Sequence, residues 1–151
     1  MDRILYCIAF QHDWRWTLAA GLMCVFGVGT AYQLLGRARA AIGMRRRNLA
    51  MLAALTGGLA VFSTHFLAMQ GYDAGGEVRY AVWATISSFF MAFASIGLAC
   101  LATLARSGPV ARALGAALAL SGVAAMHFLG VAALELPGLI VWRGDLVALA
   151  V

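Results

Sequence analysis

The sequence predicts an all-α, polytopic transmembrane helix bundle of at least four helices, with an internal helix-pair repeat and its N-terminus outside. Three observations predict this fold: 64% of the residues are apolar and only 11% are charged, the apolar residues form blocks of about twenty, and arginines gather in alternate loops. A soluble domain usually carries about a quarter charged residues. Most of the chain is therefore suited to a lipid environment.

Four continuous apolar runs are the predicted membrane helices, at residues 17–35, 49–69, 80–104 and 110–134. Each is long enough to cross a hydrocarbon core about 30 Å thick, and each ends at a Gly, Pro or charged residue. Continuous runs favour helices over barrel strands, in which apolar and polar residues alternate. A fifth run begins at Leu146 and is too short to cross by Val151, so the chain is interpreted as truncated or as ending at the interface.

Arginine placement predicts the orientation of the bundle. The segments after the first and third runs contain seven arginines and no acidic residue: Arg37, Arg39, Arg45, Arg46, Arg47, Arg106 and Arg112. Short arginine-rich loops remain cytoplasmic, so the N-terminus and the loops at 70–79 and 135–145 are predicted to face out. The net charge of +5 is attributed to arginines that orient the chain in the membrane, and nucleic acid is not an expected partner.

An internal repeat places two histidines at equivalent positions. With an offset of 62 residues, THFLAM at residues 64–69 aligns with MHFLGV at residues 126–131. The alignment predicts that His65 and His127 lie at the same depth, near the outward ends of the second and fourth helices. An ionisable residue inside a membrane helix usually marks a functional site.

Methionines beside these histidines predict the metal. Met69 follows His65 by four residues and so shares its helix face, and Met126 precedes His127 directly. Imidazole and thioether ligands suit copper, Cu(I) in particular. His65, His127, Met69 and Met126 are therefore the predicted metal ligands, with copper as the expected cofactor. The alternative is that the histidines hydrogen-bond neighbouring helices and fix their packing.

Other residues are expected to serve the fold. Four glycines are predicted to permit close helix packing: Gly57, Gly58, Gly115 and Gly122. Aromatic residues cluster at the outer interface, where a belt of Trp and Tyr is common. His12 and Asp13 are expected at the same interface, and the acids Asp73 and Glu135 are expected to be solvated.

These motifs together resemble the MHYT domain of bacterial signalling proteins. The residues that carry the resemblance are THFLAM at 64–69, MHFLG at 126–130, His-Asp-Trp at 12–14 and the arginine-rich first loop. The resemblance covers residues 1–151 and implies the first two of three motif repeats, before a third repeat. The family's motif histidines fall on His65 and His127, its first Met on Met126 and its later Met on Met69. Thr64 replaces a usual Met, and phenylalanines replace the tyrosine of the name.

The resemblance implies a sensor in the bacterial inner membrane with a periplasmic N-terminus. MHYT domains are proposed to bind copper and to sense oxygen, carbon monoxide or nitric oxide, often ahead of cytoplasmic domains that make and break cyclic di-GMP. The expected partners are therefore the lipid bilayer, a diatomic gas and a cytoplasmic signalling domain in cis or in trans. A homodimer is left open.

The residues themselves favour a binding function over catalysis. A nucleophile with its base, a carboxylate pair within the membrane and a phosphate loop are all missing from the sequence, so this segment is not expected to be an enzyme. The leading hypothesis is a sensory membrane module. A small transporter or channel for protons or metal ions is one alternative, although the residues below both histidines are mainly apolar; a structural membrane anchor is another.

Overall fold

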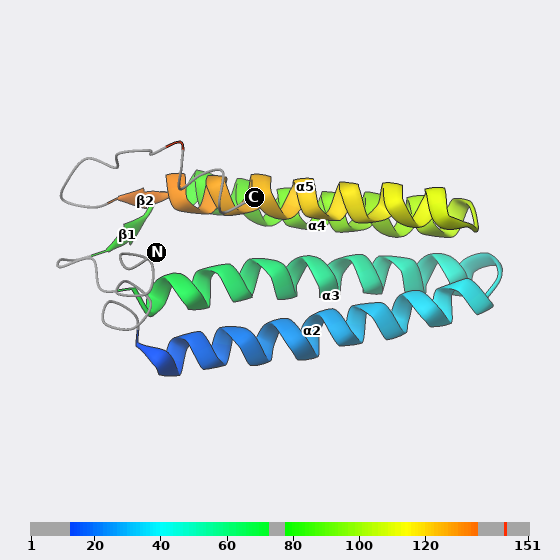
Figure 1. Cartoon of the computed structure of the whole chain (residues 1–151), viewed down its shortest axis with the longest axis horizontal. Helices are drawn as coiled ribbons and strands as arrows, with labels where there is room; N and C mark the ends of the chain where they lie inside the picture. The colour runs from blue at the N-terminus through cyan, green and yellow to red at the C-terminus, as the bar shows by residue number, and fades with distance from the viewer. Residues whose placement is uncertain (1–12, 73–77, 136–143, 145–151) are drawn as a thin grey trace.

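The structure is a computed structural model that describes residues 13–72, 78–135 and 144. In this part of the chain, four long helices run antiparallel as two hairpins (Figure 1): α2 (Trp14–Ala40), α3 (Gly43–Gln70), α4 (Val82–Ala105) and α5 (Pro109–Ala132). The helix α2 pairs with α3, α4 pairs with α5, and α3 joins the hairpins by packing on α4. All four helices are long and apolar enough to cross a membrane, which confirms the predicted fold class.

The helices extend beyond the apolar runs, so the prediction that the arginines occupy loops is wrong for most of them. Arg37 and Arg39 lie in the last turn of α2, and α3 already begins at Gly43. A helix continues past the apolar region because its backbone groups then stay hydrogen-bonded, while long arginine side chains extend toward water. Gly43 opens α3 with φ 58°, a left-handed conformation that glycine adopts without strain.

Both hairpins are closed by the same backbone hydrogen bond. The N–H of Asp13, the N-cap of α2, donates to the carbonyl of Gly71 at 2.8 Å, and the N–H of Ala81, the N-cap of α4, donates to that of Ala133 at 2.8 Å. Gly71 and Ala133 each follow the second helix of their hairpin, and they are related by the 62-residue offset found in the sequence. The structure therefore contains the predicted helix-pair repeat.

A short strand pair extends the closure of the second hairpin. Strand β1 (Arg79–Tyr80) pairs antiparallel with β2 (Leu134–Glu135), with Tyr80 opposite Leu134. The sequence placed both of those residues inside helical runs, and this detail was wrong. Apolar residues at the edge of a run have the same hydropathy in a helix and in a strand, so hydropathy alone does not distinguish these two structures.

Glycines hold the helices close together, as predicted. A Cβ atom on Gly58 would lie 2.8 Å from the Cα of Phe93 in α4, and one on Gly57 would lie 2.9 Å from Ile96 Cγ2. In the second hairpin, a Cβ on Gly122 would collide with Ser95. The α3–α4 contact thus depends on backbone surfaces that leave no space for a side chain.

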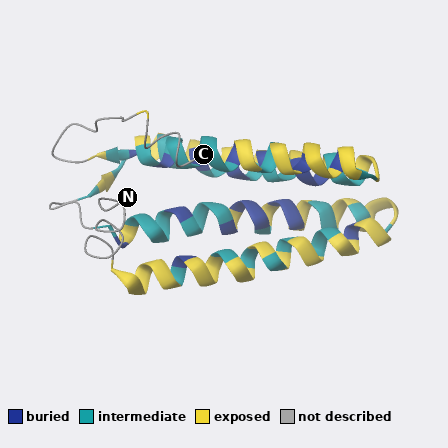
Figure 2. Ribbon diagram, viewed as in Figure 1, coloured by how far each residue is buried: buried dark blue, intermediate teal, exposed yellow. Residues whose placement is uncertain are grey.

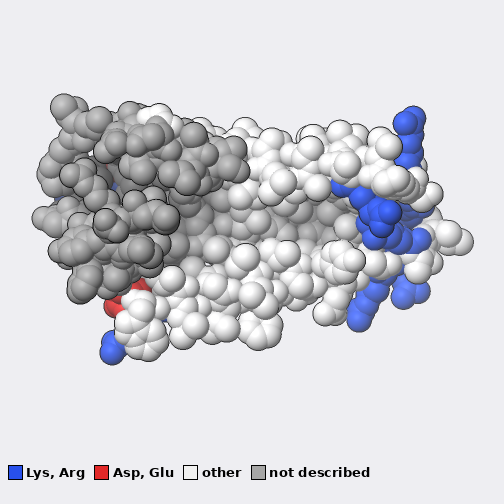
Figure 3. Space-filling view, in the orientation of Figure 1, with Lys and Arg blue, Asp and Glu red and all other residues white. Residues whose placement is uncertain are grey.

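Most of the described arginines lie at one end of the bundle. Figure 3 shows their blue atoms gathered where α2 meets α3 and α4 meets α5, whereas the described acidic residues, Asp13 and Glu135, belong to the opposite end, together with Arg15 and Arg79. We call the first of these the arginine end. The second is called the histidine end, because His65 and His127 lie close to it in α3 and α5. Between them, large apolar side chains are exposed around the bundle (Figure 2), as in Phe26, which is 70% exposed. An apolar exterior of this kind suits contact with lipid.

We expect Gly58→Ala to destabilise the bundle and Gly21→Ala to leave it unchanged or stabilise it. The added methyl group at residue 58 would overlap backbone atoms of Phe93, at a cost of about 1–3 kcal/mol. Gly21 has open space around it, so the gain in helix propensity, about 1 kcal/mol, is not opposed there. Thermal unfolding in detergent, followed by circular dichroism, measures both. Equal melting temperatures for the two variants would contradict this packing.

Candidate metal centre

The two motif histidines meet between the hairpins. His65 lies five residues before the end of α3, and His127 lies five residues before the end of α5. Their Nδ1 atoms are 3.2 Å apart, and the rings are nearly perpendicular, with centroids separated by 5.0 Å. The structure therefore confirms the matched depth predicted from the repeat and adds that the two rings are in contact.

Hydrogen bonding within this pair leaves one buried nitrogen unsatisfied. Two neutral imidazoles can share one proton between their Nδ1 atoms, and either ring can be the donor. In both arrangements, Nε2 of His65 remains buried with no hydrogen-bond partner in the described part of the chain. A buried polar atom of this kind costs about 1–3 kcal/mol, and in native structures it often indicates a missing water or ion.

Gly130 makes room for the His65 ring. A Cβ atom at residue 130 would collide with Nε2 of His65 and lie 2.6 Å from its Cδ2. The equivalent position in the first repeat is Ala68, so the repeat is asymmetric where the His65 ring packs. The sequence alone assigned no role to Gly130. The replacement of Ala68 by Gly130 between the two repeats was the one sequence feature that could have indicated it.

Aromatic rings enclose the pair on the side of strand β1. The Phe66 ring lies edge-on to His65 at 5.1 Å, the Phe128 ring lies 5.4 Å from His127, and Tyr80 packs on Phe66 at 5.4 Å. Burial raises the pKa of Tyr80 above its ordinary value of 10.0, so its hydroxyl stays protonated at neutral pH. The phenylalanine that follows each histidine thus helps to form the wall of the site.

The predicted methionine ligands lie in the same region of the two helices. Met126 is 2% exposed, and Met69 is half-buried one turn beyond His65. Across the described residues, no group of three or more His, Cys, Asp or Glu side chains is placed to hold a metal. Met69 and Met126, whose thioethers would favour a soft ion, stay predicted ligands.

Other predicted contributors have separate positions or cannot be placed. The Asp13 carboxylate accepts a hydrogen bond from the Arg15 N–H at 2.9 Å and so caps α2. Glu135 is exposed in β2, in agreement with its expected solvation. His12 and Asp73 lie outside the described residues.

The geometry of the histidine pair fits a shared metal ion. With the metal–nitrogen distance of about 2.0–2.1 Å found for zinc and tetrahedral angles, two ligating nitrogens lie about 3.3 Å apart. The observed separation of the Nδ1 atoms is 3.2 Å, close to that value. A shared ion would take the Nδ1 lone pair of each ring, and each ring would then carry its proton on Nε2.

Comparison with known families places the chain. The family model described as "MHYT: Bacterial signalling protein N terminal repeat" matches residues 58–116 and 121–151. The chain belongs to the MHYT family. Its two matched segments contain one motif histidine each and begin inside α3 and inside α5, so the family repeat has nearly the same spacing as the helix-pair repeat but different boundaries.

Longer bacterial proteins contain regions similar to this MHYT domain. An uncharacterized signaling protein of Caulobacter vibrioides is 36% identical over 93% of the chain, which covers 17% of that protein. The bifunctional diguanylate cyclase/cyclic di-GMP phosphodiesterase MucR of Pseudomonas aeruginosa is 30% identical over 86% of the chain, which covers 20% of that protein. The chain thus spans about a fifth of the length of these relatives. No solved structure matches the chain.

Proposed function

We propose that this MHYT domain is a membrane-embedded sensory module in which His65 and His127 bind copper. One observation carries the proposal: two imidazoles from separate helix hairpins meet with their Nδ1 atoms 3.2 Å apart. A bound ion would take one Nδ1 lone pair from each ring. The buried Nε2 of His65 takes no part in this bridge and would carry the ring proton.

The available donors favour copper over harder ions. Two imidazoles with the thioethers of Met69 and Met126 form a soft ligand set, and Cu(I) prefers such ligands to the carboxylates and waters chosen by magnesium or calcium. When bound, copper would supply a redox couple and a position for a diatomic gas such as oxygen, carbon monoxide or nitric oxide. Phe66 and Phe128 would keep that position poor in water.

The position of the pair suggests how a signal is passed on. His65 belongs to the first hairpin and His127 to the second, so a change in their spacing moves one hairpin relative to the other. The contact of Gly58 with Phe93 joins the same two hairpins through α3 and α4, and helices packed this closely tend to slide or rotate as rigid bodies. Movement at the histidine end would therefore reach the arginine end.

Charge and the relatives support an output on the cytoplasmic side. An arginine-rich end is expected in the cytoplasm of the bacterial inner membrane, which places the N-terminus and the histidine end in the periplasm. One relative is named as an enzyme that makes and degrades cyclic di-GMP. We propose that this domain signals to a cytoplasmic domain of that kind and has no catalytic role itself.

The sensor hypothesis has more support than a channel. The buried hydroxyls that could line a polar path, those of Ser88 and Ser95, donate to carbonyls of their own helix at 2.7 and 3.0 Å. Small and apolar residues separate the histidines from the arginine end, including Gly58 and Ala54. Proteoliposome flux that depended on His65 would instead favour a pathway for protons or metal ions.

Copper stoichiometry tests the proposed site. We expect purified protein loaded with Cu(I) to retain one ion per chain, and His65→Ala or His127→Ala to lose it, because either change leaves a single imidazole. The double variant should retain as little copper as each single variant, since the two rings act as one site. Gln70→Ala, which removes an exposed polar side chain from the end of α3, is the control.

Circular dichroism and gel filtration establish that each variant remains a folded helical bundle. Full copper retention by both single variants, or no retention by the unaltered protein, would refute the site.

A further inference from the structure

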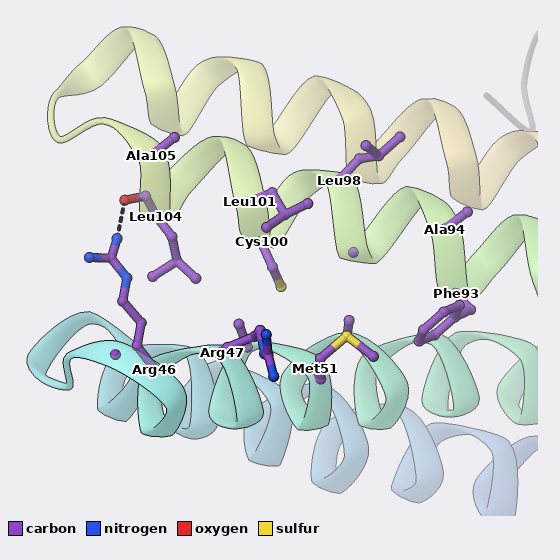
Figure 4. A pocket seen from close by; sticks show the side chains of 14 residues that line it. Arg46, Arg47, Met51, Phe93, Ala94, Leu98, Cys100, Leu101, Leu104 and Ala105 are labelled. Atoms are coloured by element: carbon purple, nitrogen blue, oxygen red, sulfur yellow. Dashed lines mark hydrogen bonds between the residues drawn. The ribbon is translucent and has the colours of Figure 1, made fainter.

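A cavity of about 690 Å³ lies between α3 and α4 at the arginine end, remote from the histidine pair. Figure 4 shows that side chains from both helices face it, with Arg46 and Arg47 on one side and Leu98 and Leu101 on the other. We call this space the α3–α4 groove. Its walls are otherwise almost entirely apolar, as at Met51.

Two guanidinium groups mark the mouth of the groove. Arg46 Nη2 donates to the carbonyl of Leu104, in the last turn of α4 (Figure 4). This bond holds the guanidinium group at the mouth and satisfies a carbonyl that the helix end leaves free. A guanidinium group has five N–H donors, so Arg46 can still bind an anion. Arg47 also lines the groove, and its Nη2 donates to Met44 Sδ at 2.8 Å, which leaves it further donors.

The charge at the mouth is not balanced by nearby acids among the described residues. Asp13 and Glu135 are the acidic residues in that part of the chain, and both lie at the histidine end. An anion at the mouth would therefore meet complementary charge and no repulsion from these carboxylates. Because guanidinium groups pair in two-pronged fashion with phosphate oxygens, a phosphate ester fits the mouth well.

The depth of the apolar walls matches one leaflet of a bilayer. The lining residues run from Gly43 to Ala54 in α3 and from Ala105 back to Phe93 in α4. At 1.5 Å per residue, each wall is about 16–18 Å long, and half of a hydrocarbon core is about 15 Å. A hydrocarbon chain that entered beside the arginines could follow the walls to the middle of the membrane.

We propose that the α3–α4 groove binds an anionic phospholipid from the leaflet at the arginine end. The phosphodiester pairs with Arg46 and Arg47, and an acyl chain lies between the helices along Met51, Leu98 and Leu101. A basic pocket between membrane helices is a common site for an anionic headgroup. This lipid lies between α3 and α4, one helix from each hairpin, at the end of the bundle opposite the histidine pair.

Native mass spectrometry of the 151-residue chain in detergent tests the proposal. The protein is incubated with phosphatidylglycerol or phosphatidylcholine that carry identical acyl chains. We expect phosphatidylglycerol to be retained about 30-fold more tightly, the effect of two arginines near the headgroup. Inorganic phosphate at equal concentration should not displace it, because phosphate lacks the acyl chain.

Matched variants separate this site from general charge attraction. Arg46→Gln with Arg47→Gln should reduce retention to the level of phosphatidylcholine, whereas Arg106→Gln with Arg112→Gln removes the same charge from the same end and should have no effect. Ala94→Trp should fill the groove and exclude the lipid; Ala117→Trp, also at an exposed alanine of a membrane helix, should not.

Three results with lipids and variants would overturn the proposal, and a fourth comes from inorganic phosphate. The first three are equal retention of the two lipids by the unaltered chain, equal loss in the two double-arginine variants, and undiminished retention by Ala94→Trp. The first comparison needs no variant, so it holds even if a substitution prevents folding. Displacement by inorganic phosphate would assign the arginines to a free anion and would equally reject the phospholipid.

Discussion

Gly130→Ala is expected to lower copper affinity about 10- to 100-fold, the range typical when a group that positions a metal ligand is lost. The new methyl group would occupy space held by the His65 ring, close to its Nε2 and Cδ2 atoms. A ring packed between helices cannot yield as the end of a flexible chain would. His65 would turn away from His127, and a residue that donates no ligand would thereby control the site. Isothermal or competitive Cu(I) titration measures the change.

A second glycine provides the control for Gly130→Ala. Gly29→Ala makes the same chemical change in a membrane helix where a Cβ atom has open space, so its copper affinity should equal that of the unaltered protein. Wild-type copper affinity in a folded Gly130→Ala variant would show that the His65 ring does not need its observed position.

Met126→Leu and Met69→Leu should each weaken Cu(I) binding about tenfold and should change Zn(II) binding much less. Thioethers bind Cu(I) well and harder ions poorly, so their removal should lower the affinity for Cu(I) more than the affinity for Zn(II). Leucine nearly conserves the volume of methionine, at a cost in stability that is usually below about 1.5 kcal/mol. Parallel titrations with Cu(I) and Zn(II) give the comparison.

Met23→Leu is the control for the methionine variants, because Met23 is 43% exposed on α2, away from the histidine pair. Equal loss of Cu(I) and Zn(II) affinity in Met126→Leu would indicate disturbed packing at a buried position. Unchanged Cu(I) affinity in both variants would remove the methionines from the ligand set and leave the two imidazoles.

Hydropathy predicted the number of helices and their class, but not their ends. Apolar runs record where lipid surrounds the chain, whereas backbone hydrogen bonding decides where a helix stops. Arg39 and Arg45 are therefore helical although both lie beyond the apolar runs. Tyr80 shows the same limit at the other end, where an apolar run continues into a strand.

The repeat predicted the histidine pair because equal depth on helices of equal direction follows from the 62-residue offset alone. The contact of the two rings depends additionally on how α3 and α5 approach each other, which the sequence pattern does not contain. Gly130 was missed for that reason: its role appears only when the His65 ring is placed against it. The methionine ligands and copper itself stay predictions.

Nitrogen-15 solid-state NMR of histidine-labelled protein in lipid bilayers tests the central claim most directly. With three histidines in the chain, the spectrum is simple enough to assign with single alanine variants. We predict a cross peak between the Nδ1 atoms of His65 and His127, as their 3.2 Å separation requires, and a shift of both signals when one Cu(I) per chain is added. If that cross peak is missing, or if copper shifts the signals of one ring alone, the two histidines do not share a metal ion.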